Sequence, residues 1–600
     1  MKKILLALIC AAMMLTACVK NLDYGNDYQN PVTHAEQIFG VNFSANQDWS
    51  TTEYGTSMIT VDAPLENITK VQVLVYVNAG DEDGNSLLRL VNEVPCKNND
   101  VIKVGYDIPS NNIGLVAVCK NDKGEIFATQ FKANEEVSFA KKSGTRGMRA
   151  IVVGHDLPDN PVISRSESSY ASTRNYPGFA GETLYMMSDA DEVMQIMEVQ
   201  DYNAFSDVMK SIIFNYLPNG RKYNNLPQIK ESGFYNEDCY AITTGDDPII
   251  VSPVYKNDGG YHEVETGDLY YYYFDPNKIE GDDVEYFKTL PKYKAIQLNR
   301  SILGDNILKK HHSYALIYWG DGTPVIGETV GSYQFPKGYK IGFMVRLKYK
   351  DAVKQGELYF DGRLNNKINK HGHFKSSGLG DNDPRMGWMS VNKKMFMCCE
   401  AGTDADFNDV IFEVEGGIEE IIIPPVFNSN FYTFCFEDQL LGDYDLNDIV
   451  LKGRRLSDTK VEYTLMACGA NDALYVFNAG EKHISKDIEA HALFNRNQNQ
   501  FVNTTVGDNA PYVVDTIIVN KTFSFLDEET RPYIFDKTKG YPVYVATKGQ
   551  DPHAIMVPYD FRWPLERICV KDAYKSFNNW ATNEITDTDW YKFPELDKVY

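Results

Sequence analysis

Two short acidic segments carry residues whose types and spacing suit the binding of a hard metal ion. Residues 404–410 and 443–449 both follow the pattern D-x-D-x-N-D with a β-branched residue after it. Oxygen ligands at positions one, three and five of a tight loop can converge on one cation, as in calcium-binding loops. The pattern therefore predicts two cation sites, with these candidate ligands: Asp404, Asp406, Asn408 and Asp409 in the first, and Asp443, Asp445, Asn447 and Asp448 in the second.

Each segment also has acidic residues upstream that could complete a coordination shell. Calcium takes 6–8 oxygens, so three side chains do not suffice. The nearest additional carboxylates are Glu400 in the first segment, and Glu437 with Asp438 in the second. Neither segment is an EF-hand, because Asp409 and Asp448 stand where that motif has glycine and a strand pattern follows.

A second interpretation of both segments is an Asx-rich turn, in which the carboxylates only cap backbone N–H groups. Uncompensated carboxylates at this density repel one another, which favours the presence of a cation. The sequence leaves both interpretations open and makes Ca²⁺ the first candidate cofactor.

Strands must position these segments, because an apolar run follows each of them. Further strand patterns occupy residues 71–77, 114–118 and 513–519, with turn-forming clusters between them. One amphipathic helix is predicted over residues 205–217, where the apolar side chains pack in a core and Pro218-Asn219-Gly220 ends the helix. The expected fold class is mainly β, with multiple β-sandwich (jelly-roll-like) domains and a few short helices.

The chain is too long for one core, and its composition shifts predict several segments. They are a signal peptide (1–17), a polar tether (18–37), an N-terminal β-sandwich (38–140), a linker or long loop (141–180), an α+β/β domain ending in the first acidic loop (181–416), and a β domain with the second acidic loop (428–600).

The N-terminus predicts export and a lipid anchor. Lys2 and Lys3 precede an uncharged apolar run over residues 4–15, which is too short to span a bilayer. The following Leu15-Thr16-Ala17-Cys18 resembles the lipobox of bacterial lipoproteins. The resemblance implies cleavage before Cys18 and acylation of that cysteine, which anchors the chain stably. The alternative is a soluble secreted protein in which this cysteine occurs by chance.

Composition and the remaining motifs narrow the function. The net charge of -24 argues against nucleic acid as a partner, because nucleic-acid binding depends on Lys and Arg.

The remaining motifs leave several smaller possibilities. Cys96 and Cys119 could form a disulfide or remain buried thiols. The tyrosine-rich residues 270–274 could stack on sugars if exposed, although a half-buried strand is the favoured interpretation. We find no catalytic motif. The pairs His311-His312 and His371-Gly372-His373 are better explained as loop residues than as metal ligands, and His262-Glu263 lacks the second His of a zincin.

A family resemblance rests on the second acidic segment. Phe436-Glu437-Asp438 together with the D-x-D-x-N-D of residues 443–448 resembles the LruC-domain family, as do residues 554–564 and 573–580. The resemblance covers residues 428–600. Residues 310–416 resemble a related domain of unknown function, but Cys399-Glu400-Ala401 replaces Phe-Glu-Asp there. The resemblance implies a surface lipoprotein of the Bacteroides type and supplies no activity.

These observations predict a non-enzymatic, lipid-anchored protein of the outer membrane. Its polar tether and acidic body favour exposure at the cell surface. Its expected role is binding or adhesion, with β domains stabilised by calcium-like cations. The alternative is a surface protein that binds or processes glycans. The expected partners are the membrane, through the lipid, and an extracellular protein or glycan.

Overall fold

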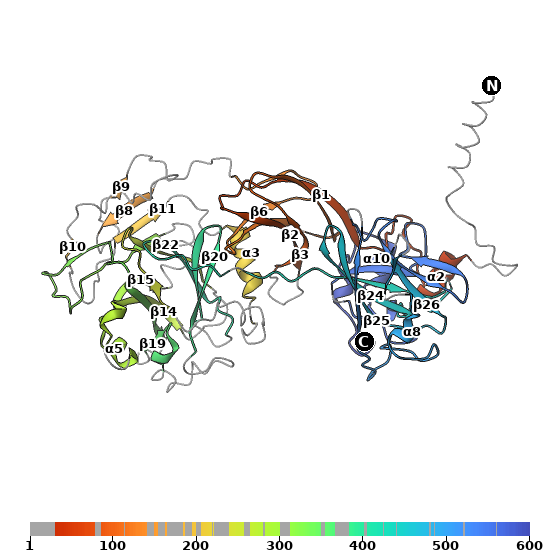
Figure 1. Cartoon of the computed structure of the whole chain (residues 1–600). Coiled ribbons are helices and arrows are strands. Elements are labelled where there is room, and N and C mark those ends of the chain that lie inside the picture. Colours follow the sequence, from red (N-terminus) through yellow and green to blue (C-terminus); the bar gives the residue numbers. More distant parts are fainter. Residues whose placement is uncertain are drawn as a thin grey trace, which may run out of the picture.

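The computed structural model is mainly β, as predicted, with antiparallel sheets and short helices (Figure 1). No helix among the residues it describes is long and apolar enough to cross a membrane. The described residues are 30–78, 86–112, 114–140, 149–153, 162–164, 184–185, 195–199, 206–218, 220, 239–256, 264–279, 283–299, 312–349, 355–365, 383–400, 405–423, 425–439, 441–478, 482–484, 487–519, 523–559 and 561–600.

Two sheets with a shared core form the N-terminal sandwich. The first has the order β4-β1-β7 and the second β3-β2-β5-β6. Their apolar strand faces meet in one cluster that includes Val73, Tyr106 and Ala117. The strands are β1 (Thr52–Thr60), β2 (Ile68–Asn78), β3 (Ser86–Pro95), β4 (Val101–Pro109), β5 (Leu115–Asn121), β6 (Ile126–Phe131) and β7 (Val137–Ser138).

The module that ends in the first acidic loop, here called the middle module, contains an eight-stranded sheet of order β20-β21-β22-β13-β16-β11-β8-β9. A second sheet has the order β12-β18-β14-β15 with β19 on β18, and β10 pairs with β17. Its elements are β8 (Arg149–Val153), β9 (Val162–Ser164), β10 (Leu184–Tyr185), β11 (Gln195–Val199), α3 (Asp207–Tyr216), β12 (Ala241–Ile242), β13 (Ile249–Lys256), β14 (Val264–Phe274), η2 (Pro276–Lys278), α5 (Asp283–Thr289), β15 (Tyr293–Asn299), β16 (His312–Ala315), β17 (Val330–Gly331), β18 (Lys340–Tyr349), β19 (Gln355–Tyr359), β20 (Met386–Val391), β21 (Lys394–Cys399) and β22 (Val410–Gly416).

Two sequence predictions fall in the middle module. Helix α3 begins after its cap Ser206 and buries its apolar stripe, which confirms the helix predicted there. The tyrosine row of β14 is buried on both faces, and Tyr271 and Tyr273 donate their hydroxyl hydrogen bonds to the carbonyls of Ile317 and Gly320. This row therefore offers no exposed platform for a sugar.

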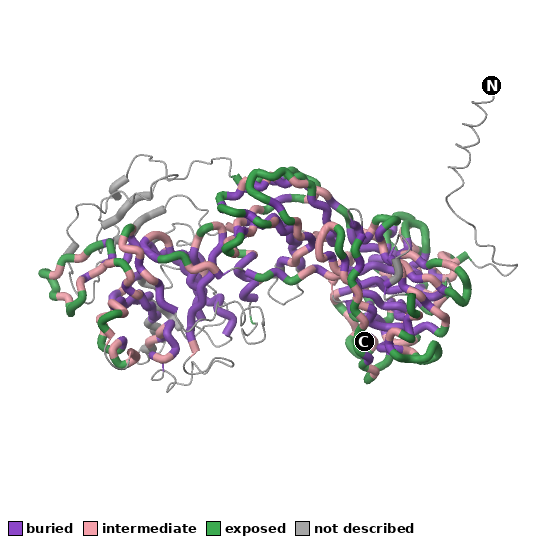
Figure 2. Tube along the Cα trace, viewed as in Figure 1, coloured by how far each residue is buried: buried purple, intermediate pink, exposed green. Residues whose placement is uncertain are grey.

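The C-terminal domain again has two sheets, of order β28-β25-β24-β23-β31 and β27-β26-β29-β30. Figure 2 shows buried residues running through its strands, with exposed residues mainly on the outer turns. Its elements are β23 (Tyr432–Phe436), β24 (Ile449–Ser457), β25 (Lys460–Ala467), β26 (Leu474–Asn478), β27 (Lys482–His483), α8 (Ala490–Leu493), β28 (Val513–Ile518), β29 (Pro532–Asp536), β30 (Tyr541–Tyr544), β31 (Ala554–Pro558), α9 (Val570–Ala573), α10 (Phe577–Thr582) and η4 (Trp590–Lys592).

The order of the modules in space differs from their order in the chain, because the N-terminal sandwich lies between the other two (Figure 1). The outer face of its β3-β2-β5-β6 sheet joins the core of the middle module through residues such as Val116 and Val118. On the other side, Arg455 of the C-terminal domain forms a buried ion pair with Asp107 at 2.6 Å. Breaking such a buried pair from one side is costly, since it leaves an uncompensated charge.

The first described segment is helix α2 (Pro31–Phe39), which overlaps the polar tether predicted for residues 18–37. Asn30 caps its first turn and Gly40 ends it in a left-handed conformation. Ala35 and Phe39 are buried in the core of the C-terminal domain. The tether prediction is therefore wrong for residues 31–37, because polar side chains alternate there with apolar ones that pack on a distant domain.

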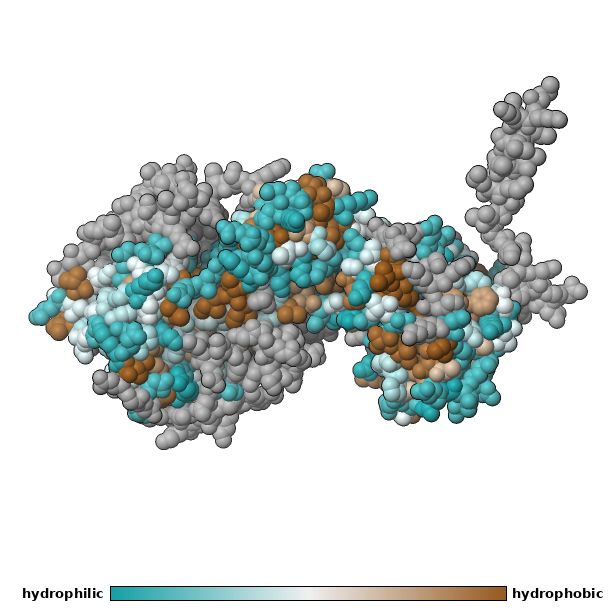
Figure 3. All heavy atoms as spheres, in the orientation of Figure 1, coloured by the Kyte–Doolittle hydropathy of each residue, from teal (hydrophilic) through white to brown (hydrophobic). Residues whose placement is uncertain are grey.

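The described surface drawn in Figure 3 is mostly hydrophilic, and the described cysteines are buried free thiols. Hydrophilic residues predominate on the face drawn in Figure 3, and apolar residues form separate groups there. Cys96 and Cys119 are free, buried thiols, so the disulfide alternative for this pair is not realised. Burial raises the pKa of the Cys96 thiol to about 11, which makes it a poor nucleophile at neutral pH.

Candidate functional site

The second acidic segment forms the connection of a β-hairpin in the C-terminal domain. Strand β23 pairs with β24 in antiparallel register, and Phe436 lies opposite Ile449. Glu437 is therefore the first residue after one strand, and Asp448 is the last residue before the next. Residues 437–448 must reverse the chain within this hairpin, so their side chains are brought together by the strand pairing.

The backbone of this loop alternates between ordinary and left-handed conformations. Tyr444 and Leu446 have φ angles of 57° and 55°. A left-handed conformation costs a residue other than glycine roughly 1–2 kcal/mol. Glu437 offsets this cost, because its carboxylate accepts the N–H of Tyr444 at 3.3 Å and that of Leu446 at 2.5 Å. The buried Glu437 carboxylate therefore accepts the N–H groups of both left-handed residues, Tyr444 and Leu446.

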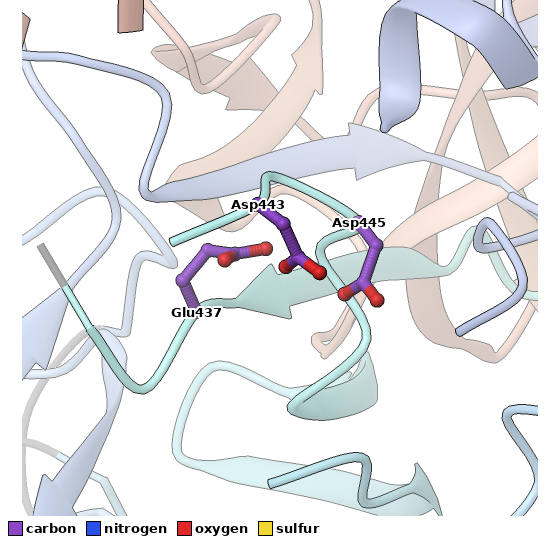
Figure 4. A group of neighbouring side chains, drawn as sticks. All are labelled: Glu437, Asp443 and Asp445. Carbon is purple, nitrogen blue, oxygen red and sulfur yellow. The ribbon is translucent and has the colours of Figure 1, made fainter. Parts of the chain in front are cut away.

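This alternation separates the acidic side chains from the apolar ones. Tyr444 and Leu446 are fully buried in the core of the domain. Oxygens of Glu437, Asp443 and Asp445 all lie within 4.8 Å of one another, and Figure 4 shows these three carboxylates next to each other on the loop. Glu437 and Asp445 are buried whereas Asp443 is exposed, so the group is open to solvent on one side.

The electrostatics of the group favour a bound positive charge or bound protons. Burial raises the pKa of Glu437 well above its usual range, and the charges of Asp448, Asp445 and Asp443 raise it further. Burial and the Asp443 charge raise the pKa of Asp445 to about 8. A carboxylate in such a site keeps its charge at neutral pH at a cost in stability unless a cation is present.

Asp438, another predicted ligand, faces a cation that the chain itself supplies. Lys539 Nζ lies 2.6 Å from Asp472, 3.4 Å from Asp536 and 3.6 Å from Asp438. Asp448 accepts the N–H of Asp438 at 2.6 Å, so it caps the start of the loop. These contacts place Asp438 beside the Lys539 ammonium and give Asp448 a backbone partner.

A third segment closes the loop, and sequence reasoning missed it. Asn447 Nδ2 donates to the carbonyl of Pro564 at 3.2 Å, and the N–H of Arg567 donates to Asp445 at 2.6 Å. Asn447 Oδ1 is buried without a hydrogen-bond partner. Residues 564–567 therefore form a turn that holds positions three and five of the D-x-D-x-N-D pattern. Residues 554–564 carried the family resemblance, which was the available signal for this segment.

The first acidic segment has the same construction. It connects β21 to β22, and Cys399 pairs with Val410. Ala405 and Phe407 have φ angles of 61° and 60°, and both are fully buried. Glu400, the first residue after the strand, accepts the N–H of Phe407 at 3.1 Å. Glu400 and Glu437 therefore occupy equivalent places, although their sequence distances to the D-x-D-x-N-D pattern differ.

The first loop is also held by a turn from elsewhere in the chain, as residues 564–567 hold the second loop. Asn408 Nδ2 donates to the carbonyl of Leu217 at 3.0 Å, and the N–H of Gly220 donates to Asp406 at 2.8 Å. Gly220 and Arg567 have left-handed φ angles of 66° and 64°. Both loops are therefore held by a turn that offers a carbonyl and, three residues later, an N–H group. The turn precedes the first loop in the chain but follows the second.

Across the described ranges, only the second loop brings three acidic side chains within 4.8 Å of one another. Asp404 of the first loop lies outside those ranges, and Asp406, Asn408 and Asp409 are buried. Beside the first loop lies the buried Arg385, whose carbonyl accepts the N–H of Glu400 at 2.9 Å.

Most of the other candidates lie outside the described residues, and one additional contact lacks the properties of a nucleophile. Cys18 and the residue pairs His262-Glu263, His311-His312 and His371-His373 lie outside the described residues, apart from the backbone of His312. A Cys468–His491–Glu489 contact, which sequence reasoning missed, has Cys468 Sγ at 3.3 Å from His491 Nε2. Cys468 is fully buried and burial raises the pKa of its thiol, so this group lacks the exposed thiolate of a nucleophile.

Comparison with known proteins places one family match in the C-terminal domain. Residues 520–591 match the model of a domain of unknown function (DUF4842). The match includes the turn of residues 564–567 but not the acidic loop itself. A search of curated proteins gives no match. The family match supports a shared domain in this region, and the LruC identity predicted for residues 428–600 stays a prediction.

Proposed function

We propose that this protein is a lipid-anchored, non-catalytic binding or adhesion protein of the cell surface, whose C-terminal domain is stabilised by a calcium-like cation. Glu437, Asp443 and Asp445 are its proposed ligands. The lipobox-like sequence before Cys18, the acidic composition and the lack of a catalytic motif support the location and the non-enzymatic role.

One observation carries the cation proposal. Two buried carboxylates and one exposed carboxylate lie within 4.8 Å of one another, and no lysine, arginine or histidine in the described part of the chain forms an ion pair with them. The nearby Lys539 is engaged by three other aspartates. Like charges at this separation raise each other's pKa, and a divalent cation would remove that repulsion.

The ligand chemistry favours calcium over transition metals. Carboxylate oxygens suit Ca²⁺, Mg²⁺ and Mn²⁺, whereas imidazole and thiolate ligands suit zinc and copper. Each carboxylate oxygen of Glu437 accepts one backbone N–H, and an ionised carboxylate offers about four acceptor positions in all. Water on the exposed side of Asp443 would complete the 6–8 oxygens that calcium takes.

Calcium titration of the full chain tests the cation. At a concentration about 100 times the Kd, binding to the folded state adds about 2.7 kcal/mol, or roughly 5–10 °C in the Tm of a domain of this size. Asp443→Asn is expected to abolish the rise, whereas Asp597→Asn, a change of an exposed aspartate in the same domain, is expected to retain it. An unchanged wild-type Tm in calcium and in chelator would refute the cation.

Mass spectrometry of the mature amino terminus tests the anchor. We expect a chain that begins at Cys18 and carries acyl groups. A mature chain cleaved elsewhere, with an unmodified terminus, would contradict the lipoprotein proposal. The alternative glycan-binding or glycan-processing role, which rests on the aromatic abundance and the surface location, stays a prediction; the buried tyrosine row of β14 does not support it.

A further inference from the structure

Residues 30–52 form a segment, here called the strap, that is packed into the C-terminal domain and separated from it in sequence by several hundred residues. Phe39 and Trp49 are buried in the same cluster as Phe577 and Trp580. The Trp49 ring lies 6.1 Å from Phe577 in a stacked arrangement. Helix α2 lies beside α10 in Figure 1. The strap is therefore part of the core of the C-terminal domain rather than of the sandwich that follows it.

Hydrogen bonds to main-chain groups of the strap hold it along its length. Asn578 Nδ2 donates to the carbonyl of Phe39 at 3.0 Å, and Lys571 donates to that of Ile38. The N–H of Ser44 donates to the carbonyl of Ala581 at 2.9 Å. The N–H of Met556 donates to the carbonyl of Trp49 at 3.1 Å. These bonds fix the strap at several points.

The strap also contacts the second acidic loop directly. The Tyr444 ring lies 5.4 Å from Phe39 in an edge-to-face arrangement and 6.4 Å from His34. Tyr444 stands between two proposed cation ligands, Asp443 and Asp445. Its left-handed backbone directs the ring into the core, against the strap, while the flanking carboxylates gather on the other side. The loop conformation that gathers the carboxylates is thus the conformation that positions the Tyr444 ring.

We propose that strap docking and cation occupancy of the second loop are coupled through Tyr444, so that the cation locks the strap. This inference rests on the proposed function. A cation that stabilises the loop also stabilises the aromatic surface on which Phe39 packs. Because coupling between two binding events is reciprocal, a docked strap raises the affinity of the loop for the cation by the same factor.

The coupling would regulate how far the folded body can move from the membrane. Twelve residues separate Cys18 from Asn30, and 34 separate it from Thr52. At about 3.3–3.6 Å per extended residue, the reach is at most ~40 Å with the strap docked and ~120 Å with it released. With the strap docked, the C-terminal domain is the module next to the anchor, and the middle module is the distant one.

Hydrogen exchange on the full mature chain tests the coupling. We expect the amides of residues 31–49 to exchange about tenfold more slowly in calcium than in chelator, a typical coupling factor. Asp443→Asn is expected to remove this difference. Tyr444→Ala is expected to speed exchange of the strap about tenfold even in calcium, whereas strand β24, followed in the same experiment, stays protected and so reports an intact domain.

The reciprocal experiment measures calcium affinity. Phe39→Ala, which changes no ligand, is expected to weaken calcium binding about tenfold. Phe494→Ala removes a comparably buried ring from the other core of the same domain and is expected to leave the affinity unchanged.

The possible outcomes distinguish the proposed cation site from the proposed coupling between the cation and the strap. If calcium raises the Tm but strap exchange does not change, the coupling is wrong and the cation site stands. If Tyr444→Ala leaves the strap as protected as in the wild type, the coupling is also wrong. If the wild-type chain binds no calcium, the proposed function fails and the coupling fails with it.

Discussion

The two acidic loops share a backbone conformation, and among the described residues the second loop has a group of three neighbouring carboxylates. Each follows a strand with a glutamate, alternates left-handed residues, and is held by a turn from elsewhere in the chain. Within the described residues, the second loop gathers three acidic side chains, and no basic side chain forms an ion pair with them. In the first loop Asp404 lies outside the described residues, and the backbone carbonyl of Arg385 accepts the N–H of Glu400. The shared pattern therefore builds the loop in both modules, and we expect a cation in the second.

The spacing of the acidic residues alone leaves two interpretations open, capping of backbone N–H groups and binding of a cation. Capping of backbone N–H groups occurs in both loops, through Glu400 and Asp406 in one and Glu437 and Asp445 in the other. Capping does not exclude a cation, because an ionised carboxylate offers about four acceptor positions and each N–H group occupies one of them. The following predictions test whether the second loop also binds a cation and separate its behaviour from that of the first.

The largest expected effect is on stability without a metal. Glu437→Ala leaves two buried N–H groups without an acceptor, which costs about 2–6 kcal/mol at ~1–3 kcal/mol each. Glu437→Gln keeps an acceptor and removes the charge, so it is expected to cost much less in chelator. Calorimetry of the C-terminal transition measures both. Equal losses of unfolding free energy in the Glu437→Ala and Glu437→Gln variants would show that the charge of Glu437, rather than its capping of N–H groups, determines the stability of the loop.

The next largest expected effect is a difference between the two loops in the stability that calcium adds. Asp443→Asn is expected to remove the ~2–3 kcal/mol that calcium adds. Asp406→Asn, at position three of the first loop, is expected to leave this gain intact, because it changes the other module. Domain-resolved hydrogen exchange with and without calcium measures both variants. Loss of the calcium gain in Asp406→Asn would show that the two loops do not act separately.

The calcium response of the second loop is expected to increase with pH. The pKa of Asp445 is raised to about 8 in the folded state, against an ordinary value of ~3.9. Its proton therefore stabilises the fold fully below about pH 4, and that stabilisation is lost as the pH rises to about 8. Calcium competes with this proton and with that of Glu437, whose pKa is also raised, so the calcium affinity should rise at least about tenfold per pH unit below pH 8. Calorimetric titration at pH 5 and pH 8 measures this; equal affinities would contradict it.

The smallest expected effect concerns the turns that hold the loops. Gly220→Ala forces a side chain into a left-handed conformation and is expected to destabilise the middle module by ~1 kcal/mol. Arg567→Gly relieves the same strain in the equivalent turn and is expected to stabilise the C-terminal domain by up to ~1 kcal/mol. Opposite signs in denaturant unfolding would support the equivalence of the turns, and matching signs would contradict it.

Local patterns predicted the local elements well. The 3.6-residue periodicity after Ser206 identified helix α3, and the mainly β composition identified the fold class. Helix α2 was missed because its nine residues bury only Ala35 and Phe39, which is too weak a period to separate from a polar tether. The local sequence also did not show that the tyrosines on both faces of β14 are buried, because this burial depends on contacts with residues 317–320.

The sequence by itself determined the spacing of the acidic residues and the strands on either side of them, because each depends on neighbours within one element. Only the tertiary structure decided what each carboxylate meets. Asp438 faces Lys539, Asp445 meets Arg567, and Tyr444 packs on Phe39. These partners lie 101 to 405 positions away along the chain. Burial and counter-charge act through space, so a local pattern can specify a loop without specifying its charge balance.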